Sequence, residues 1–243
     1  MPEPGYYADN FYEDNKKIMK KEEMKTAELY TLEHTMAKSL LEQFEYPWQA
    51  LEHIGEFVEN LGKTLSEEEY DNPVPGVWIH RTAKVAPTAG IMGPVVIGPG
   101  AEIRHCAFIR GKVLIGANSV VGNSSELKNS ILFDNVQVPH YNYVGDSILG
   151  YKSHMGAGSI TSNVKSDKEL VKIHAEDEEI ETGRKKVGAM IGDCVEVGCG
   201  SVLNPGTVIG KNSNIYPLSS VRGGVDANSI YKRQGEIAEK HND

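Results

Sequence analysis

Aliphatic residues recur at every sixth position through the middle of the chain. The spacing holds without interruption at Ile79, Val85, Ile91, Ile97, Ile103, Ile109, Ile115, Val121 and Leu127. The frame shifts by one residue at Leu132 and again at Leu149, and a second block of the same period begins at Ile191. A period of six fits neither an α-helix nor a hairpin strand, whose side chains repeat about every 3.6 and 2 residues. It predicts a parallel β-helix, in which short strands joined by tight turns stack their aliphatic side chains inside a prism.

Residues 1–76 lack this period and predict an N-terminal helical segment followed by a linker. Steps of four from Leu32 to Phe44 predict one helix with Thr31 as its N-cap. Pro47 suits the first turn of a second helix, and Gly62 suits its end. We expect this segment to serve packing or oligomerisation, with docking of a partner as the alternative.

The repeat is expected to cover residues 77–230, with one insertion at 164–186, and residues 231–243 are expected to form a C-terminal tail. The insertion is charged and ends in the basic run Arg184-Lys185-Lys186. A solvated surface loop is one interpretation. We favour an arm that reaches a neighbouring subunit, because the basic run follows the candidate site described below.

Composition and charge limit the kinds of partner that the chain can have. The chain has a formal net charge of −9 and a sequence pI of about 5.4, which argues against a nucleic-acid partner. No apolar run approaches the roughly 20 residues that a membrane-spanning helix needs, and the N-terminus has no basic and apolar signal pattern. We therefore expect a cytoplasmic protein whose three cysteines are reduced.

Charged side chains converge on one edge of the predicted prism. Arg110 and Lys128 are separated by 18 residues, which is one coil, so two cations should lie about 4.8 Å apart along the stack. Such a pair is unfavourable unless an anion lies beside it, and a phosphate would satisfy both cations. Glu126 lies on the same side of its strand, and His140 and Tyr143 follow one coil later.

Four motifs carry a family resemblance: "VGNSSELKNS", "VPHYNYVGDS", "MGAGSITSN" and "VGCGSVLNPGTVIG". Over residues 77–230 the chain resembles hexapeptide-repeat, left-handed parallel β-helix acyltransferases. The motifs look like those of the acetyltransferase domain of the bifunctional glucosamine-1-phosphate acetyltransferase/N-acetylglucosamine-1-phosphate uridylyltransferase. The long loop "TGRKKVGAMIGD" resembles that of archaeal and clostridial sugar-phosphate nucleotidyltransferase-like relatives. The resemblance implies a mainly β fold, a homotrimer with sites between subunits, and N-acetylation of an amino-sugar 1-phosphate by acetyl-CoA.

The resemblance also assigns roles to single residues. His140 would be the general base that accepts the proton of the sugar amine, a task suited to an imidazole with its ordinary pKa of about 6.5, and Glu126 would orient it. Substrate contacts would come from Arg110, Lys128, Tyr143, Asn163, His154 and one of Lys185 and Lys186. Contacts to acetyl-CoA would come from Ala157, Cys199 and Pro217. His154, Cys199 and Pro217 replace the family's usual asparagine, serine and alanine, which leaves the sugar and the acyl group open.

Three other functions can be compared with this one. Nothing in residues 1–76 resembles a uridylyltransferase domain, so nucleotidyl transfer is not expected of this chain. A metal-dependent carbonic anhydrase on the same scaffold would need a closely spaced histidine pair, which His105, His140 and His154 do not provide. No metal is expected, since Cys194 and Cys199 have no further close partner. A sugar-phosphate or nucleotide-sugar sensor, or a structural trimer, is the non-catalytic alternative.

Overall fold

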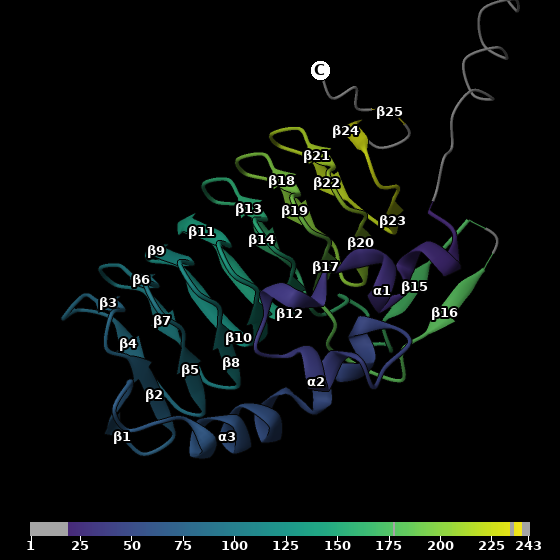
Figure 1. Ribbon diagram of the computed structural model, residues 1–243. Helices are drawn as coiled ribbons and strands as arrows, with labels where there is room; N and C mark the ends of the chain where they lie inside the picture. Colours follow the sequence, from purple (N-terminus) through teal and green to yellow (C-terminus); the bar gives the residue numbers. More distant parts are fainter. Residues whose placement is uncertain (1–18, 177, 234–235, 240–243) are drawn as a thin grey trace, which may run out of the picture.

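The computed structural model describes residues 19–176, 178–233 and 236–239, which form a stack of short parallel strands flanked by an N-terminal helical segment (Figure 1). The sequence predictions for residues 1–18 and 240–243 lie outside the described residues. The strands are β1 (Tyr70–Val74), β2 (Val77–His80), β3 (Lys84–Val85), β4 (Gly90–Ile91), β5 (Val95–Ile97), β6 (Glu102–Ile103), β7 (Phe108–Ile109), β8 (Val113–Ile115), β9 (Val120–Asn123), β10 (Glu126–Leu132), β11 (Gln137–His140), β12 (Tyr143–Leu149), β13 (His154–Met155), β14 (Ile160–Thr161), β15 (Lys172–His174), β16 (Glu179–Glu181), β17 (Ala189–Ile191), β18 (Glu196–Val197), β19 (Val202–Leu203), β20 (Thr207–Ile209), β21 (Asn214–Ile215), β22 (Ser220–Val221), β23 (Gly224–Val225), β24 (Ser229–Arg233) and β25 (Glu236–Glu239).

The left-handed parallel β-helix expected from the sequence is confirmed. Val77, Val95 and Val113 pair in successive coils at intervals of 18 residues. From Ile97 to Leu127 the aliphatic residue of each hexapeptide is at most 1% exposed. The six-residue period therefore reports burial in the prism, because each coil removes these side chains from water only against its neighbours.

Departures from the 18-residue register between β7 and β17 fall at one corner of the prism. Phe108 pairs with Glu126 at a spacing of 18, but Val113 pairs with Ser130 at 17. Likewise Tyr143 pairs with Ile160 at 17, whereas Ile148 pairs with Met190 at 42. The one-residue slip therefore occurs at the turn after Lys128, and the long insertion occurs at the turn after β14. Both turns belong to the same corner as the turn after β7.

We call residues 110–112, 128–129 and 145–146 the cation corner. Lys112, Asn129 and Asp146 adopt left-handed backbone there, with φ of 57°, 48° and 48°. Asn and Asp tolerate this conformation better than other residues with side chains. We call the neighbouring corner, residues 123–124, 140–141, 157–158, 199–200 and 217–218, the histidine corner.

The N-terminal segment is helical but more broken than predicted. It contains 3-10 helices η1 (Lys21–Met24), η2 (Leu32–His34) and η3 (Pro47–Glu52), and α-helices α1 (Thr26–Leu29), α2 (Lys38–Leu41) and α3 (Ile54–Thr64). The single helix predicted from Thr31 to Phe44 is wrong, because Thr35 is fully extended at φ −157° and ψ 144°.

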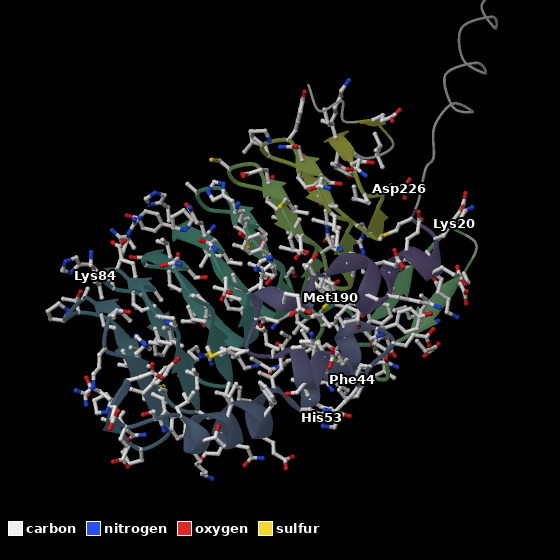
Figure 2. The ribbon with its side chains drawn as sticks, in the orientation of Figure 1. Lys20, Phe44, His53, Lys84, Met190 and Asp226 are labelled. Atoms are coloured by element: carbon white, nitrogen blue, oxygen red, sulfur yellow. The ribbon has the colours of Figure 1, made fainter. Side chains whose placement is uncertain are left out.

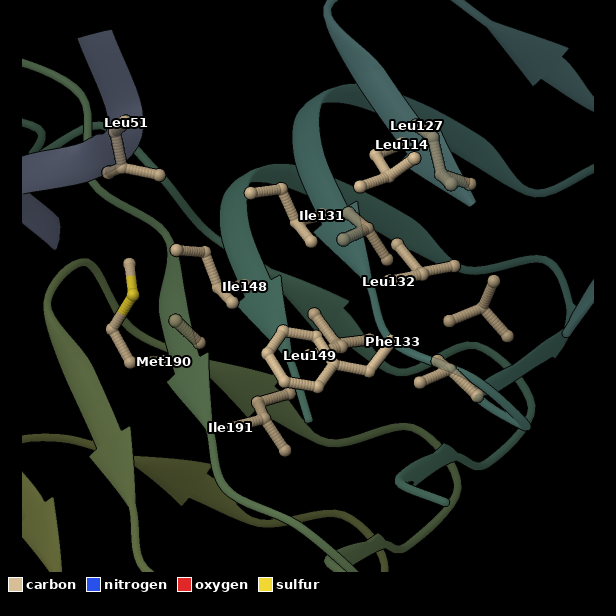
Figure 3. Close-up of a cluster of buried hydrophobic side chains, with 14 of the residues drawn as sticks. Leu51, Leu114, Leu127, Ile131, Leu132, Phe133, Ile148, Leu149, Met190 and Ile191 are labelled. Carbon is tan, nitrogen blue, oxygen red and sulfur yellow. The ribbon is translucent and has the colours of Figure 1, made fainter. Parts of the chain in front are cut away.

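Tertiary contacts override the helical pattern there. The backbone N–H of Thr31 donates to Asp193 Oδ2 at 2.6 Å, and the hydroxyl of Tyr30 donates to the carbonyl of Ile148 at 3.2 Å. These contacts hold the chain along the wall of the β-helix, so burial outweighs local propensity. Figure 3 shows Leu51 of this segment beside Ile131, Ile148 and Met190 in the buried cluster.

Two further segments carry strands where loops were expected. β1 lies in the predicted linker and pairs antiparallel with β2. β24 begins at Ser229, just before the predicted tail, and pairs antiparallel with β25 inside it. The insertion forms the β15–β16 hairpin, and it contacts the N-terminal segment through Lys21–Glu178 at 3.2 Å and Arg184–Glu52 at 3.1 Å. Whether it also reaches a neighbouring subunit stays a prediction.

Candidate functional site

The two corners bound one face of the prism, formed by β7 and the first halves of β10 and β12. Arg110 and Lys128 follow the paired residues Ile109 and Leu127, so they occupy the same position in adjacent coils, as the sequence predicted. His140 precedes the strand that carries Tyr143, and Tyr143 pairs with Glu126. The face thus has a histidine at one edge and two cations at the other.

Arg110 is held by Glu126. One guanidinium nitrogen donates to Glu126 Oε1 at 2.7 Å, and this hydrogen bond raises the pKa of Arg110 above its usual range. Arg110 also lies 6.0 Å from the ring centroid of Phe108. The arginine therefore stays charged, and its planar fork is oriented over the face.

A buried carboxylate organises the cation corner. The side chain of Asp146 is 5% exposed, and its Oδ2 lies 3.6 Å from Lys128 Nζ. Asp146 also accepts hydrogen bonds from Asn129 Nδ2 at 2.8 Å and from Asn163 Nδ2 at 2.6 Å. Asp146 thus fixes the positions of Lys128, Asn129 and Asn163, because hydrogen bonds to a charged group are the stronger kind.

Tyr143 joins this network from the middle of the face. Asn163 Nδ2 donates to the Tyr143 hydroxyl at 3.3 Å, and burial raises the pKa of Tyr143. A Cβ at Gly145 would lie 2.5 Å from the Tyr143 hydroxyl and 2.8 Å from Asn163 Nδ2. Only glycine at position 145 leaves room for this contact, and the hydroxyl keeps its proton for a ligand.

A pocket of about 980 Å³ opens at the cation corner. Its lining comes from the β-helix, the end of the insertion and the N-terminal segment, and includes Arg110, Lys112, Lys128, Asp146, Arg184, Lys185, Lys186, Phe44, Gln49, Leu51 and Glu52. Both predicted loop lysines therefore meet the predicted cation pair. Figure 2 places Phe44 and His53 on the N-terminal segment, where their rings stack at 5.2 Å.

The histidine corner aligns the predicted base with the predicted acetyl-CoA contacts. The carbonyls of His140, Ala157 and Cys199 accept hydrogen bonds from Gly158, Gly200 and Leu218 of the coil above, at 2.8–2.9 Å. His140, Ala157, Cys199 and Pro217 therefore form one column. In the described part of the chain, no hydrogen bond or ion pair links the exposed imidazole of His140 to Glu126, whose partner is Arg110.

His154 lies elsewhere. It belongs to β13 in the second sheet, and its Nδ1 lies 2.7 Å from Glu196 Oε2. There it lines a groove of about 440 Å³ with Cys199 and Pro217. The structure thus groups His154 with the predicted acetyl-CoA residues and not with Tyr143 or Asn163.

Sequence reasoning missed three residues that line the pocket, namely Asp146 and Lys112 of the cation corner and Glu52 of the N-terminal segment. Asp146 had a signal, because it follows Asn129 by one shortened coil of 17 residues and Asn163 follows it by another 17. Lys112 and Glu52 had none, since their proximity depends on how the N-terminal segment packs.

The metal alternative finds no support among the residues that the structure describes. They contain no cluster of three or more His, Cys, Asp or Glu side chains that could hold an ion. His105 contacts Thr88 Oγ1 at 2.9 Å and lies two coils from His140, about 9.6 Å along the stack and too far to share zinc. No helix in the described ranges is both long and apolar enough to cross a membrane.

Comparisons with known proteins agree with the motifs. Residues 91–183 match the family model described as the GMPPB C-terminal domain. The bifunctional protein GlmU of Methanococcus maripaludis (strain S2) is 31% identical over 210 residues, which cover 79% of this chain and 47% of that protein. A bifunctional sugar-1-phosphate nucleotidylyltransferase/acetyltransferase of Sulfurisphaera tokodaii is 31% identical over 174 residues, which cover 64% of this chain and 43% of that protein. The chain therefore spans less than half the length of these relatives.

Solved structures show more distant likeness. A perosamine N-acetyltransferase from Caulobacter crescentus, in complex with CoA and GDP-perosamine, is 16% identical with a TM-score of 0.33 over 68% of this chain and 57% of that one. The polySia-specific acetyltransferase NeuO is 15% identical with a TM-score of 0.43 over 68% of this chain and 76% of that one. The two sequence relatives and the family model show that the β-helix resembles the C-terminal acetyltransferase region of GlmU-type bifunctional proteins, as the sequence motifs predicted.

Proposed function

We propose that the chain transfers an acetyl group from acetyl-CoA to the amine of a sugar that carries a phosphate at its anomeric carbon. An amino-sugar 1-phosphate such as glucosamine 1-phosphate is the smallest such acceptor. The observation that carries the proposal is the arrangement of one face, with His140 and the predicted acetyl-CoA column at one corner and Arg110 and Lys128 at the other. A phosphate at the cation corner would direct the sugar along the face toward His140.

The reaction needs one base and a site for the phosphate. The sugar nitrogen attacks the thioester carbonyl, a C–N bond forms, and the C–S bond breaks as the amine proton passes to His140. The CoA thiolate leaves and takes up a proton. Tyr143 and Asn163 contact the sugar phosphate, with Asp146 fixing Asn163 and Lys128. His154, Cys199 and Pro217 line the groove that would receive part of acetyl-CoA.

The proposed assembly is a homotrimer that completes the site between subunits. Support comes from exposed apolar side chains at the histidine corner, where Tyr141 is 63% exposed and Leu218 is 85% exposed. Side chains of this size are uncommon at left-handed positions in contact with water, and both have positive φ. Burial against a second copy would account for them.

The test is thiol release from acetyl-CoA with glucosamine 1-phosphate as acceptor. His140→Ala should lower kcat about 10²–10⁴-fold, because the base is lost, while the affinity for the sugar phosphate is retained. His105→Ala is the matched control, since His105 lies in the same column and is bonded to Thr88. Wild-type turnover by His140→Ala would remove the base from the proposal. No release with any amino-sugar phosphate would favour the non-catalytic binding alternative.

A further inference from the structure

The pocket at the cation corner is larger and more positive than an anomeric phosphate requires. Six of its lining residues are cations, namely Arg110, Lys112, Lys128, Arg184, Lys185 and Lys186, against the two carboxylates Glu52 and Asp146. In a chain of net charge −9, such a concentration of positive charge is not a property of the average surface. Clefts lined by one sign of charge collect ligands of the other sign.

Among the described residues, only part of this positive charge is balanced by carboxylates. Arg110 pairs with Glu126, Lys128 with Asp146 and Arg184 with Glu52. Over the described ranges, Lys112, Lys185 and Lys186 form no ion pair with a carboxylate, although all three line the pocket. Three lysines around one pocket repel one another unless an anion lies between them.

The pocket extends away from His140. Along each coil the face runs from the histidine corner through Glu126 or Tyr143 to Lys128 or Gly145, and then turns at Asn129 or Asp146. The pocket begins at Arg110 and Lys128 and continues past the turn to Lys112 and the N-terminal segment. In the proposed function the phosphate of the sugar lies at Arg110 and Lys128, so the space beyond the turn is left for a further group of the ligand.

Lys112 is built into this second part. Its aliphatic stem lies across α3 at Gly55, where an added Cβ would come within 3.1 Å of Lys112 Cγ and Cδ. The absence of a side chain at position 55 thus lets the lysine lie along the helix while its charge reaches the pocket. Phe44, Gln49 and Leu51 complete the wall with an aromatic ring, an amide and an aliphatic side chain.

We infer that this second part is a subsite for a nucleoside diphosphate, so that the acceptor is a nucleoside-diphosphate amino sugar. The inference rests on the proposed function for the placement of the sugar. The first phosphate contacts Arg110 and Lys128, the second contacts Lys112 and the loop lysines, and the nucleoside lies against Phe44, Gln49 and Leu51. A pocket of about 980 Å³ has the volume of sites that enclose ligands of this size.

Titration calorimetry on the full chain tests the subsite without catalysis. The ligands are UDP, GDP, dTDP, pyrophosphate, inorganic phosphate and CoA. At least one nucleoside diphosphate should bind about tenfold more tightly than pyrophosphate, because only it contacts the wall of the N-terminal segment. Nucleoside diphosphates that bind no more tightly than pyrophosphate overturn the inference.

Variants of the exposed residue Lys112 distinguish a loss of binding at the subsite from a loss of folding and from a loss of CoA binding. Lys112→Gln should weaken the best nucleoside diphosphate about tenfold, and Lys112→Arg should restore its affinity because the charge returns. Lys84→Gln is the control, as Lys84 is exposed on β3 of the other sheet (Figure 2). Undiminished binding in Lys112→Gln, or a loss that affects CoA instead, overturns the inference.

Thiol release with the wild-type chain keeps the two proposals distinguishable. A nucleoside diphosphate could bind while no thiol is released from acetyl-CoA with either glucosamine 1-phosphate or the matching nucleoside-diphosphate glucosamine. That result would refute the proposed reaction but support the subsite. Release with glucosamine 1-phosphate at an efficiency equal to that of the nucleoside-diphosphate sugar would leave the reaction standing and remove the subsite.

Discussion

Asp146→Asn should destabilise the protein far more than loss of a typical acidic side chain. The carboxylate is 5% exposed and accepts from Asn129 at 2.8 Å and from Asn163 at 2.6 Å, with Lys128 at 3.6 Å. An amide can accept from only one of the two asparagines, and its own N–H₂ then faces the other donor. One charge-assisted hydrogen bond is lost, at about 1.5–3 kcal/mol, and one buried donor is left unsatisfied, at about 1–3 kcal/mol.

The expected loss in free energy of unfolding is therefore about 3 kcal/mol or more, which lowers Tm by about 6–12 °C for a chain of this size. Urea denaturation followed by circular dichroism gives the free energy, and a thermal scan gives Tm. Glu102→Gln is the matched control, because Glu102 pairs with Arg104 at 3.0 Å but is 44% exposed. That exposed pair should contribute no more than about 1 kcal/mol. Equal losses in the two variants would refute the central role given to Asp146.

Two further predictions concern ionisation and assembly. Burial raises the pKa of Tyr143, so its hydroxyl should remain protonated near pH 10, where an exposed tyrosine is half ionised. The contribution of the neutral hydroxyl to the free energy of unfolding should fall as the pH rises above about 10. A phenolate difference spectrum between wild type and Tyr143→Phe that titrates at the ordinary value would contradict this. The proposed trimer predicts a mass of three chains in light scattering. Leu218→Asp, at the 85% exposed position, should shift that mass toward one chain. A wild-type mass of one chain would contradict the trimer.

The β-helix could be predicted because its signal is local and repeated. Each buried aliphatic residue faces the same environment in every coil, so the six-residue spacing alone specifies which side chains stack. The same regularity placed Lys128 in the coil above Arg110, and Ala157 in the coil above His140, since these positions are set by coil spacing.

The N-terminal segment could not be predicted in the same way. Its break at Thr35 depends on contacts such as Thr31 with Asp193, which lie 162 residues apart in the chain. The position of Glu52 beside Arg184, and of Leu51 beside Asn129, follows from that docking. Sequence periodicity contains no information on such pairs, so the part of the pocket wall that the N-terminal segment forms was missed.

Between β7 and β17, one corner of the prism absorbs the variation in chain length. The slip to 17 residues and the jump to 42 both occur at the cation corner, while the strands on either side keep their pairing. Coils of this kind can therefore gain or lose residues at that corner without shifting the hydrophobic core or the histidine corner. The scaffold thus separates a histidine corner of constant coil spacing from a cation corner of variable length, so loops of other lengths could be grafted at positions 164–186 while the stack stays folded.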